Sequence, residues 1–324
     1  MLRILLTGGA GFIGSHLAER LLGLDHQLVV VDDLNDFYSP EQKEANLASI
    51  REAGPFEFHK VDICDRETIF RIVREYRPDA IIHLAARAGV RPSLADPLLY
   101  EHVNVFGTTV LLEAARLAST RKFVFASSSS VYGVTQQIPF REDDLSIRPI
   151  SPYAATKIAG EKLCFTWSHL YGIDTVCLRF FTVFGPRQRP DLAIRKFVDC
   201  IREGRPIPVF GELTTARDYT FVADIVDGIV SALNFDCRYE IFNLGNSRPV
   251  PLGGMIETIE RVLGQRAQLD RLPAQPGDVP LTFADISKAR HALAYEPRTT
   301  LEEGLRQFVS WYAPKLSVAS VSDL

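Results

Sequence analysis

Short apolar runs alternate with helical stretches along the first half of the chain. The apolar runs contain few polar positions, which is typical of strands that a fold covers on both faces. The expected strands cover residues 3–7, 27–31, 57–61, 80–84, 122–126 and 175–179, and the expected helices lie near residues 12–22, 41–53, 65–76, 97–118 and 152–171. Alternating strands and helices predict an α/β fold with a doubly wound parallel sheet.

The pattern changes after Phe181, where proline and glycine become frequent and the expected helices are shorter. These helices lie near residues 192–203, 222–234, 253–263, 285–293 and 301–312. We expect a smaller C-terminal α/β domain that caps the carboxyl ends of the strands, where ligands bind in such folds. The expected division is 1–181 with about 220–245 for the first domain, 182–219 and 246–314 for the cap, and a loose tail over 315–324.

The composition limits the class of protein. The 324 residues are 46% hydrophobic and 23% charged, which suffices for substantial cores. The net charge of −4 gives no reason to expect binding to nucleic acid or to anionic membranes. No apolar run approaches the ~20 residues of a membrane span, and the strand at residues 3–7 leaves no room for a signal peptide. Five dispersed cysteines without metal or redox spacing indicate reduced thiols in a cytoplasmic protein, and we expect no metal site.

Three glycines follow the first expected strand at a regular spacing. Gly8, Gly11 and Gly14 open the first helix in a variant of the dinucleotide-binding fingerprint. Glycine permits a tight turn and a close approach of the backbone to a pyrophosphate, which sits at the positive end of the helix. We therefore expect a dinucleotide cofactor at this turn.

An acidic pair, Asp32 and Asp33, ends the second expected strand, about 20 residues beyond the glycines. A carboxylate at this place accepts hydrogen bonds from both ribose hydroxyls. It would also repel a 2′-phosphate. The sequence therefore favours NAD over NADP as the cofactor.

Tyr153 and Lys157 are four residues apart in the helix expected over 152–171, so they share one face of it. A free tyrosine loses its proton near pH ~10, too high for a base at neutral pH, but an adjacent ammonium lowers this pKa. The hydroxyl run Ser127–Ser130 lies upstream. A serine that donates to the same substrate oxygen would complete a unit that moves a proton on and off an alcohol.

Together, these motifs resemble the extended short-chain dehydrogenases/reductases of the nucleotide-sugar epimerase and dehydratase group. Further matches at residues 61–62, 83–86, 104–108, 130–133, 217–221 and 284–288 extend the resemblance over nearly the whole chain. It implies a Rossmann-type sheet, NAD as cofactor and a UDP-sugar as substrate. It also implies a homodimer through the helices near 98–117 and 152–171, which have apolar outer positions such as Leu163, Phe165 and Trp167.

The resemblance implies roles for individual residues as well. Asp62 would contact the adenine amino group, and Asn104 would lie near the catalytic end of the cleft. Arg217 would bind the diphosphate of the sugar nucleotide, which suits a planar guanidinium. The full set of expected cofactor contacts is Gly8, Gly11, Phe12, Ile13, Gly14, Asp32, Asp33, Asp62, Ile63, Leu84, Ala85, Ala86, Asn104, Ser127, Tyr153, Lys157 and Phe180.

The residues beside the catalytic hydroxyl separate the reactions that this group of enzymes performs. The resemblance implies that the sugar is first oxidised at C4, and a 4,6-dehydratase then needs a carboxylate pair just after the catalytic hydroxyl. Counted back from residues 131–133, that hydroxyl is Ser128, and the acidic positions hold Ser129 and Ser130. A serine is too weak an acid or base to replace a carboxylate. We therefore expect a 4-epimerase, with a transient 4-keto sugar and with Ser128, Tyr153 and Lys157 as its catalytic residues.

The segment 179–191 resembles that of the UDP-glucuronate 4-epimerases, with Thr182 where neutral-sugar epimerases usually have asparagine. Residues 87–91, 151–157 and 275–279 indicate the same, and Gln275 stands where neutral-sugar epimerases commonly have arginine. A uronate carboxylate needs hydroxyl donors and a positive charge. The expected substrate contacts are Arg91, Ser128, Ser129, Ser130, Tyr153, Thr182, Arg189, Arg217, Gln275 and Asp278.

Three functions stay open at this point. The sequence favours an NAD-dependent 4-epimerase that interconverts UDP-glucuronate and UDP-galacturonate. A 4-epimerase of neutral UDP-hexoses or N-acetylhexosamines, or a UDP-uronate decarboxylase, would use the same scaffold. The third is a non-catalytic NAD-binding relative, although such a protein normally loses the tyrosine or the lysine.

Overall fold

Seven parallel strands form the central sheet of the computed structural model, which describes residues 1–135, 137–275 and 277–319. The sheet order is β10-β6-β5-β4-β1-β2-β3, and each of its strand pairs is parallel. The predicted doubly wound α/β fold is confirmed. The strands are β1 (Arg3–Thr7), β2 (Gln27–Asp32), β3 (Glu57–Lys60), β4 (Ala80–His83), β5 (Lys122–Ser128), β6 (Asp174–Phe180) and β10 (Tyr239–Leu244).

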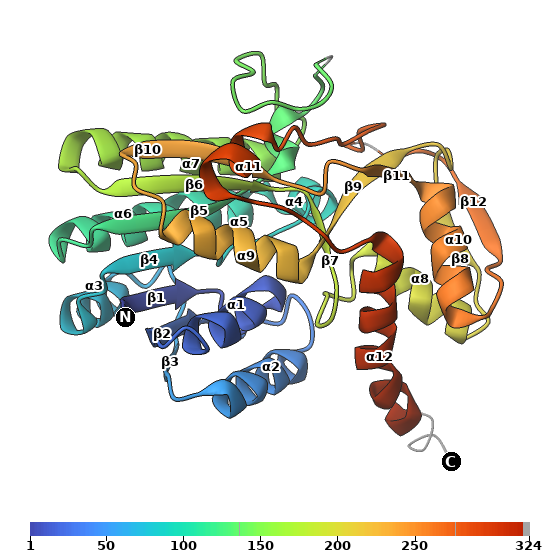
Figure 1. Ribbon diagram of the computed structural model, residues 1–324, viewed down its shortest axis with the longest axis horizontal. Coiled ribbons are helices and arrows are strands. Elements are labelled where there is room, and N and C mark those ends of the chain that lie inside the picture. Colours follow the sequence, from blue (N-terminus) through green and yellow to red (C-terminus); the bar gives the residue numbers. More distant parts are fainter. Residues whose placement is uncertain (136, 276, 320–324) are drawn as a thin grey trace.

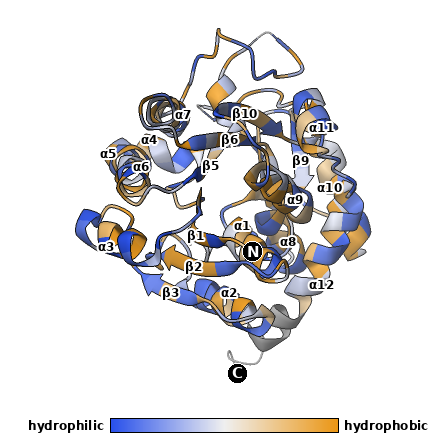
Figure 2. Cartoon of the chain, turned by 60° about the vertical axis from the view of Figure 1, so that its left-hand side comes forward, coloured by the Kyte–Doolittle hydropathy of each residue, from blue (hydrophilic) through white to orange (hydrophobic). Residues whose placement is uncertain are grey.

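Helices cover both faces of this sheet because successive side chains of a buried strand point to opposite faces. Leu6 and Val30 pack in one apolar core with α1 (Phe12–Leu22), α2 (Pro40–Ala53) and α9 (Val222–Leu233). Leu5 and Val29 pack in a second core with α3 (Arg66–Tyr76), α6 (Gly107–Leu117) and α7 (Pro152–Tyr171). Figure 1 shows the layered arrangement, and Figure 2 shows hydrophobic residues along β2 and α9.

The region between β4 and α6 differs from the single helix predicted near residues 97–118. It contains α4 (Val90–Ala95), α5 (Pro97–Glu101) and a π-helical turn over His102–Phe106 that continues into α6. A π turn inserts an extra residue into the helix and is frequent at functional sites. This turn carries the buried Asn104.

The second half of the chain adds strands that the sequence did not reveal. Here β7 (Thr182–Phe184), β9 (Ala216–Phe221) and β11 (Pro249–Pro251) form a three-stranded sheet, and β8 (Ile207–Phe210) pairs with β12 (Leu269–Leu272). The helices are α8 (Ala193–Arg202), α10 (Leu252–Leu263), α11 (Ser287–Leu293) and α12 (Leu301–Ala319). In Figure 1 most of these elements lie beside the end of the central sheet.

Helix α12 corrects the prediction for the C-terminus. It continues to Ala319, so residues 315–319 are helical and not the loose tail that was expected. Residues 320–324 of that tail lie outside the described residues. Among the described helices, none combines the length and the apolar character that crossing a membrane requires.

Candidate active site

The turn between β1 and α1 brings the backbone of two strands close together. Gly8 has φ +71°, and a Cβ built on it would lie 2.7 Å from the Ala85 nitrogen. A Cβ on Gly14 would lie 2.1 Å from the Gly8 carbonyl oxygen. Gly11 is the N-cap residue of helix α1 and has no side chain to cap it, so the amides of the first turn remain directed at the space in front of the helix. Such a turn is suited to a pyrophosphate.

A cleft opens in front of this turn, and almost every predicted cofactor contact lines it. We call it the cofactor cleft. Carboxyl ends of the parallel strands meet at its floor, which explains why residues far apart in sequence gather here. The predicted contacts that line it are Gly8, Gly11, Phe12, Ile13, Gly14, Asp32, Asp33, Asp62, Ile63, Leu84, Ala85, Ala86, Ser127, Tyr153, Lys157 and Phe180.

The acidic residues of the cleft are held by backbone amides. Asp32 accepts hydrogen bonds from Ala10 N at 3.1 Å and Leu34 N at 3.0 Å. Burial raises the pKa of Asp32, while these bonds and Lys43 oppose the rise. Its carboxylate is thereby fixed beside the glycine turn, as an NAD ribose requires. Sequence reasoning missed Asn35, Phe37, Tyr38 and Lys43, which also line the cleft; the loop after Asp33 gave no motif that would have identified them.

Asn104 lies behind the wall of the cofactor cleft. Its Oδ1 accepts a hydrogen bond from Arg87 N at 2.8 Å, and its Nδ2 donates to Arg87 O at 3.0 Å and Thr156 Oγ1 at 3.1 Å. Both amide hydrogens are therefore used inside the protein. Asn104 supports the loop that carries Arg87, a cleft residue, and connects it to α7, whereas the sequence predicted a direct cofactor contact.

Tyr153 and Lys157 lie together at the inner end of the cleft. Ser151 Oγ caps the start of α7 by accepting from Ala154 N, and Pro152 occupies the first turn. Lys157 Nζ donates to Ala126 O at 2.7 Å and lies 5.9 Å from the centre of the Tyr153 ring. Burial lowers the pKa of Lys157 to about 8, although Cys164 and Glu161 favour its charged form. The Lys157 ammonium is therefore held beside the tyrosine, with a pKa of about 8 that lies close to neutral pH.

Ser128 approaches the tyrosine from the end of β5. Burial raises the pKa of Tyr153, whereas a hydrogen bond with Ser128 and the charge of Arg189 lower it. Ser128 Oγ also accepts from Ser130 N at 3.1 Å, because a short 3₁₀ helix over Ser129–Tyr132 turns the chain back at this point. The structure thus brings together Ser128, Tyr153 and Lys157, as predicted.

A second pocket adjoins the cofactor cleft on the side of the second half of the chain, and we call it the sugar pocket. Arg91, Thr182, Arg217 and Asp278 line it. Arg91 Nη2 donates to Asp278 Oδ2 at 2.8 Å, and its guanidinium lies 4.8 Å from the centre of the Phe210 ring. Gln275 lines an adjoining cavity together with Arg217 and Asp278.

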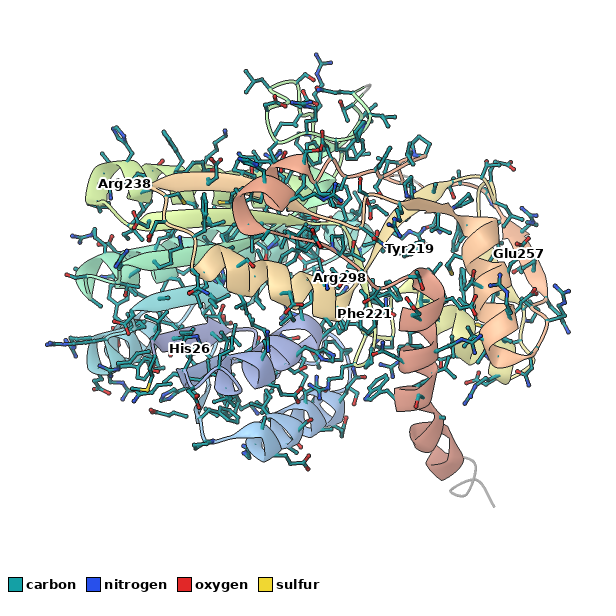
Figure 3. The ribbon with its side chains drawn as sticks, in the orientation of Figure 1. His26, Tyr219, Phe221, Arg238, Glu257 and Arg298 are labelled. Carbon is teal, nitrogen blue, oxygen red and sulfur yellow. The ribbon has the colours of Figure 1, made fainter. Side chains whose placement is uncertain are left out.

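Arg217 projects from β9, next to Tyr219, which also lines the sugar pocket and is labelled in Figure 3. Burial lowers the pKa of Arg217, while Tyr219 and Asp278 oppose that shift. A guanidinium whose charged form is disfavoured by burial gains from an anion in the pocket. This site is suited to a diphosphate.

Arg189 stands at the boundary between the two hollows. It lines the cofactor cleft, whereas its partner Asp191 lines the sugar pocket. Two hydrogen bonds of 2.9 Å join Arg189 Nε and Nη2 to the Asp191 carboxylate. The guanidinium also lies 5.3 Å from the centre of the Phe37 ring. Asp191 and Phe37 therefore hold the Arg189 guanidinium in place, and its positive charge lowers the pKa of Tyr153.

Metal chemistry was not expected from the sequence. Within residues 1–135, 137–275 and 277–319, no group of three or more His, Cys, Asp or Glu side chains is arranged to hold a metal ion.

Comparison with known proteins places this arrangement in a family. Residues 4–245 match the model of the NAD dependent epimerase/dehydratase family. The UDP-glucuronate 4-epimerase of Thermodesulfobacterium geofontis is 43% identical over 308 residues, which cover 95% of each chain. The crystal structure of UDP-glucuronic acid 4-epimerase from Bacillus cereus, in complex with UDP-glucuronic acid and NAD, is similar with a TM-score of 0.91 and 35% identity, covering 97% of this chain and 99% of that one. The UDP-glucose 4-epimerase of Thermotoga maritima with UDP-glucose gives a TM-score of 0.89 at 31% identity, with 97% and 99% coverage.

Proposed function

This chain belongs to the NAD dependent epimerase/dehydratase family, and on that basis we propose that it interconverts UDP-glucuronate and UDP-galacturonate by inverting C4 of the sugar. The observation that carries the proposal is that Tyr153, Lys157 and Arg189 line the cofactor cleft together, next to Ser127 at the end of the strand that carries Ser128. The similarity to UDP-glucuronate 4-epimerases over nearly the full length supports it.

The residues of the cleft divide the work. NAD, when bound by the glycine turn and Asp32, supplies a reversible hydride acceptor. Tyr153 takes the proton of the C4 hydroxyl and later returns it, and Ser128 donates a hydrogen bond to the same oxygen. Lys157 favours the phenolate form of Tyr153 by its charge. Return of the hydride to the opposite face of a rotated 4-keto sugar then completes the epimerisation.

Elimination is suppressed by the two residues that come after the catalytic serine. Ser129 and Ser130 occupy the positions at which a dehydratase needs a carboxylate pair. Their hydroxyls donate hydrogen bonds but cannot remove a C5 proton at neutral pH. Elimination is therefore disfavoured, and return of the hydride, which gives an epimerase, is favoured instead.

A uronate is the substrate that the polar groups fit best. A guanidinium has five N–H donors, of which Arg189 uses two for Asp191, so the far edge of the group is left for the C6 carboxylate. Thr182 lines the sugar pocket and supplies a further hydroxyl donor. Ser129 and Ser130, which were also expected to contact the substrate, are not among the described residues that line the cofactor cleft or the sugar pocket. The 4-keto uronate is a β-keto acid, and firm hydrogen bonding to its carboxylate would keep the C5–C6 bond out of alignment with the carbonyl. Carbon dioxide released by Arg189→Ala would support this role, and clean epimerisation by that variant would contradict it.

One assay tests the function as a whole. Purified protein is incubated with UDP-glucuronate, and the products are followed by NMR. We expect UDP-galacturonate; a pentose product would indicate the decarboxylase alternative. No turnover of UDP-glucuronate together with interconversion of UDP-glucose and UDP-galactose would overturn the substrate assignment in favour of a neutral-sugar epimerase, the second candidate, which the similarity to the Thermotoga maritima enzyme supports.

We also propose a homodimer. Exposed apolar side chains lie along α5, the π turn and α6 (Leu98, Phe106, Leu117) and on α7 (Phe165, Leu170). Leu163 and Trp167, which were expected to face outward with Phe165, pack partly against the core. A double substitution Leu98→Asp/Phe165→Asp should convert a dimer into a monomer in sedimentation velocity experiments. A wild-type protein that sediments as a monomer would refute the proposal.

The domain division is proposed from the same structure. Strand β10 pairs with β6 of the central sheet, and α9 packs in the core of that sheet, which supports assigning residues near 220–245 to the cofactor domain. Residues 182–219 and 246–314 then form the sugar-nucleotide domain. A cytoplasmic location is proposed as well, supported by the five cysteines, all of which are free thiols.

A further inference from the structure

A buried ion pair lies directly behind the catalytic residues. Glu161 on α7 is 1% exposed and Arg179 on β6 is 3% exposed. Two hydrogen bonds of 2.9 Å join them, from Arg179 Nε to Glu161 Oε1 and from Nη2 to Oε2. Removing both charges from water costs at least as much as their attraction returns in many buried pairs. Stability alone is therefore a poor reason for this pair to stand here.

Glu161 is connected to the catalytic serine through its neighbour. Tyr153, Lys157 and Glu161 follow one another at four-residue spacing, so they share one face of α7. Ser127 Oγ donates to Glu161 Oε1 at 2.6 Å, and Ser127 directly precedes Ser128 on β5. The carboxylate that binds Arg179 therefore also holds the strand end from which Ser128 projects.

Arg179 holds the chain on the other side of Ser128. In the sheet, Arg179 is the register partner of Ser127. Its guanidinium lies 4.8 Å from the centre of the Tyr132 ring, and Tyr132 ends the 3₁₀ helix that begins just after Ser128. The Tyr132 hydroxyl in turn donates to Asn243 Oδ1 on β10 at 2.7 Å. Residues before and after Ser128 are thus both anchored to the ion pair.

We propose that Glu161 and Arg179 are positioning residues that hold the end of β5, and with it Ser128, against the face of α7 that carries Tyr153 and Lys157. The inference rests on the proposed function, because it assigns a purpose to the alignment of the two hydroxyls on the C4 oxygen. Lys157, on the same face of α7, binds the carbonyl of Ala126, so the pair and the lysine together hold the two residues before Ser128, Ala126 and Ser127, against α7.

The test begins with Glu161→Gln, which keeps the side-chain shape but removes the charge and points amide hydrogens at Arg179. We expect kcat to fall about 10²-fold, the effect of misplacing a catalytic group by about 1 Å. KM for the UDP-sugar should change little, because neither residue lines the sugar pocket as the structure describes it. A purely structural role would lower the melting temperature and leave the kcat of the folded protein unchanged.

Two further variants separate position from stability. Glu161→Gln/Arg179→Met replaces the ion pair by neutral side chains of similar length, which often restores stability. Its melting temperature should recover while kcat stays low; recovery of both would overturn the inference. Asp224→Asn is the matched control, since this buried carboxylate on α9 accepts bonds from the Arg298 and Thr299 amides away from the cleft. It should lower the melting temperature and keep the wild-type kcat.

Crystal structures provide a readout that needs no substrate. In Glu161→Gln we expect the end of β5 to shift, with Ser127, Ser128 and Tyr132 displaced relative to α7. An unchanged Ser128 would overturn the inference whether or not the protein acts on UDP-glucuronate. Wild-type protein that leaves UDP-glucuronate unchanged would instead count against the proposed function alone.

Discussion

The cofactor cleft and the sugar pocket are built by different means. The part of the cofactor cleft that faces the pyrophosphate is a backbone turn, Gly8–Gly14, whose shape follows from glycines within one short stretch of sequence. The sugar pocket is lined by side chains from segments near residues 89–92, 182, 188–197, 208–219, 252 and 278. Local sequence thus decides where the cofactor binds, while the pairing of distant segments decides which sugar fits.

Their charges differ in the same way. Asp32 in the cofactor cleft is fixed by backbone amides of its own neighbourhood. In the sugar pocket, Arg91 and Asp278 are 187 residues apart in the sequence and hold each other through a hydrogen bond of 2.8 Å. The position of Arg91 can therefore adjust when substrate binds, because an anionic group of the substrate can replace Asp278 as its partner. We therefore expect substitutions in the cofactor cleft to cause large losses of activity or NAD affinity. Substitutions in the sugar pocket should weaken substrate binding by modest factors.

The largest effect should come from replacing Tyr153, the residue proposed to exchange a proton with the sugar. Tyr153→Phe removes the group that exchanges a proton with the sugar, so we expect kcat to fall about 10³-fold. NAD content after purification, measured by absorbance and mass spectrometry, should stay at the wild-type level. Residual activity within about tenfold of wild type would show that another group exchanges the proton.

Gly14→Ala should weaken NAD binding to the cofactor cleft while leaving the sugar pocket intact. The added Cβ would meet the Gly8 carbonyl oxygen at 2.1 Å, and neither backbone can move without opening the turn. Overpacking typically costs about 1–3 kcal/mol, so we expect about a 10²-fold loss of NAD affinity by calorimetry. Gly23→Ala is the matched control at the other end of α1, where the new Cβ would lie 3.4 Å from Glu19 O, an ordinary contact. Equal affinities for the two variants would contradict the assignment of the turn.

Lys157→Met should stabilise the fold while it lowers turnover. A pKa lowered from 10.5 to about 8 corresponds to a cost of about 3 kcal/mol for the charged form. Loss of the bond to Ala126 O offsets about 1 kcal/mol of this gain. The free energy of unfolding at pH 7 should therefore rise by about 2 kcal/mol in denaturant titrations.

The pH dependence provides the control for that prediction. The unfolded lysine holds its proton up to a higher pH than the folded one, so wild-type stability rises between about pH 8 and pH 10.5. The advantage of Lys157→Met should be largest below pH 8 and fade over this range. An advantage that does not vary with pH would show that the buried charge is not its cause.

Arg91→Ala should have the smallest effect. The side chain is 46% exposed and its ion pair with Asp278 is screened by solvent, so the expected loss is about 1 kcal/mol, or roughly fivefold in KM for the UDP-sugar. The affinity for NAD and kcat should stay unchanged. Arg266→Ala, which removes an exposed arginine paired with Glu260 on α10, is the control. A KM change that is insensitive to salt would argue against a charge effect.

The sequence predicted the strands of the first half of the chain to within one or two residues. Strands such as Ile4–Leu6 and Val29–Val31 are continuous apolar runs, and a central parallel strand must be apolar on both faces. The same rule failed for β7, β9 and β11. Strands β7 and β11 have three residues each, β9 is partly polar, and β11 contains Pro249 and Pro251. Such strands are defined by their partners and not by their own composition.

Candidate site residues divide along the same line. Gly8, Asp32 and Tyr153 belong to local motifs, and the structure places them in the cleft as expected. Asn104 was correctly placed near the site but not at the cofactor, because only the π turn directs it towards Arg87 and Thr156. The partnership of Arg189 with Asp191 and that of Glu161 with Arg179 were not predicted, since neither pair has a sequence signature.

Local sequence was enough to define the sheet, the dinucleotide turn and the tyrosine–lysine face of α7, because each depends on residues a few positions apart. The packing of distant elements set how Ser128 is held against Tyr153, how Arg189 is oriented, and which arginines face the sugar pocket. This division reflects the range of the forces involved. Backbone turns and helix faces are set by neighbouring residues, whereas buried charges take whatever partner the packing of distant elements brings within hydrogen-bonding distance.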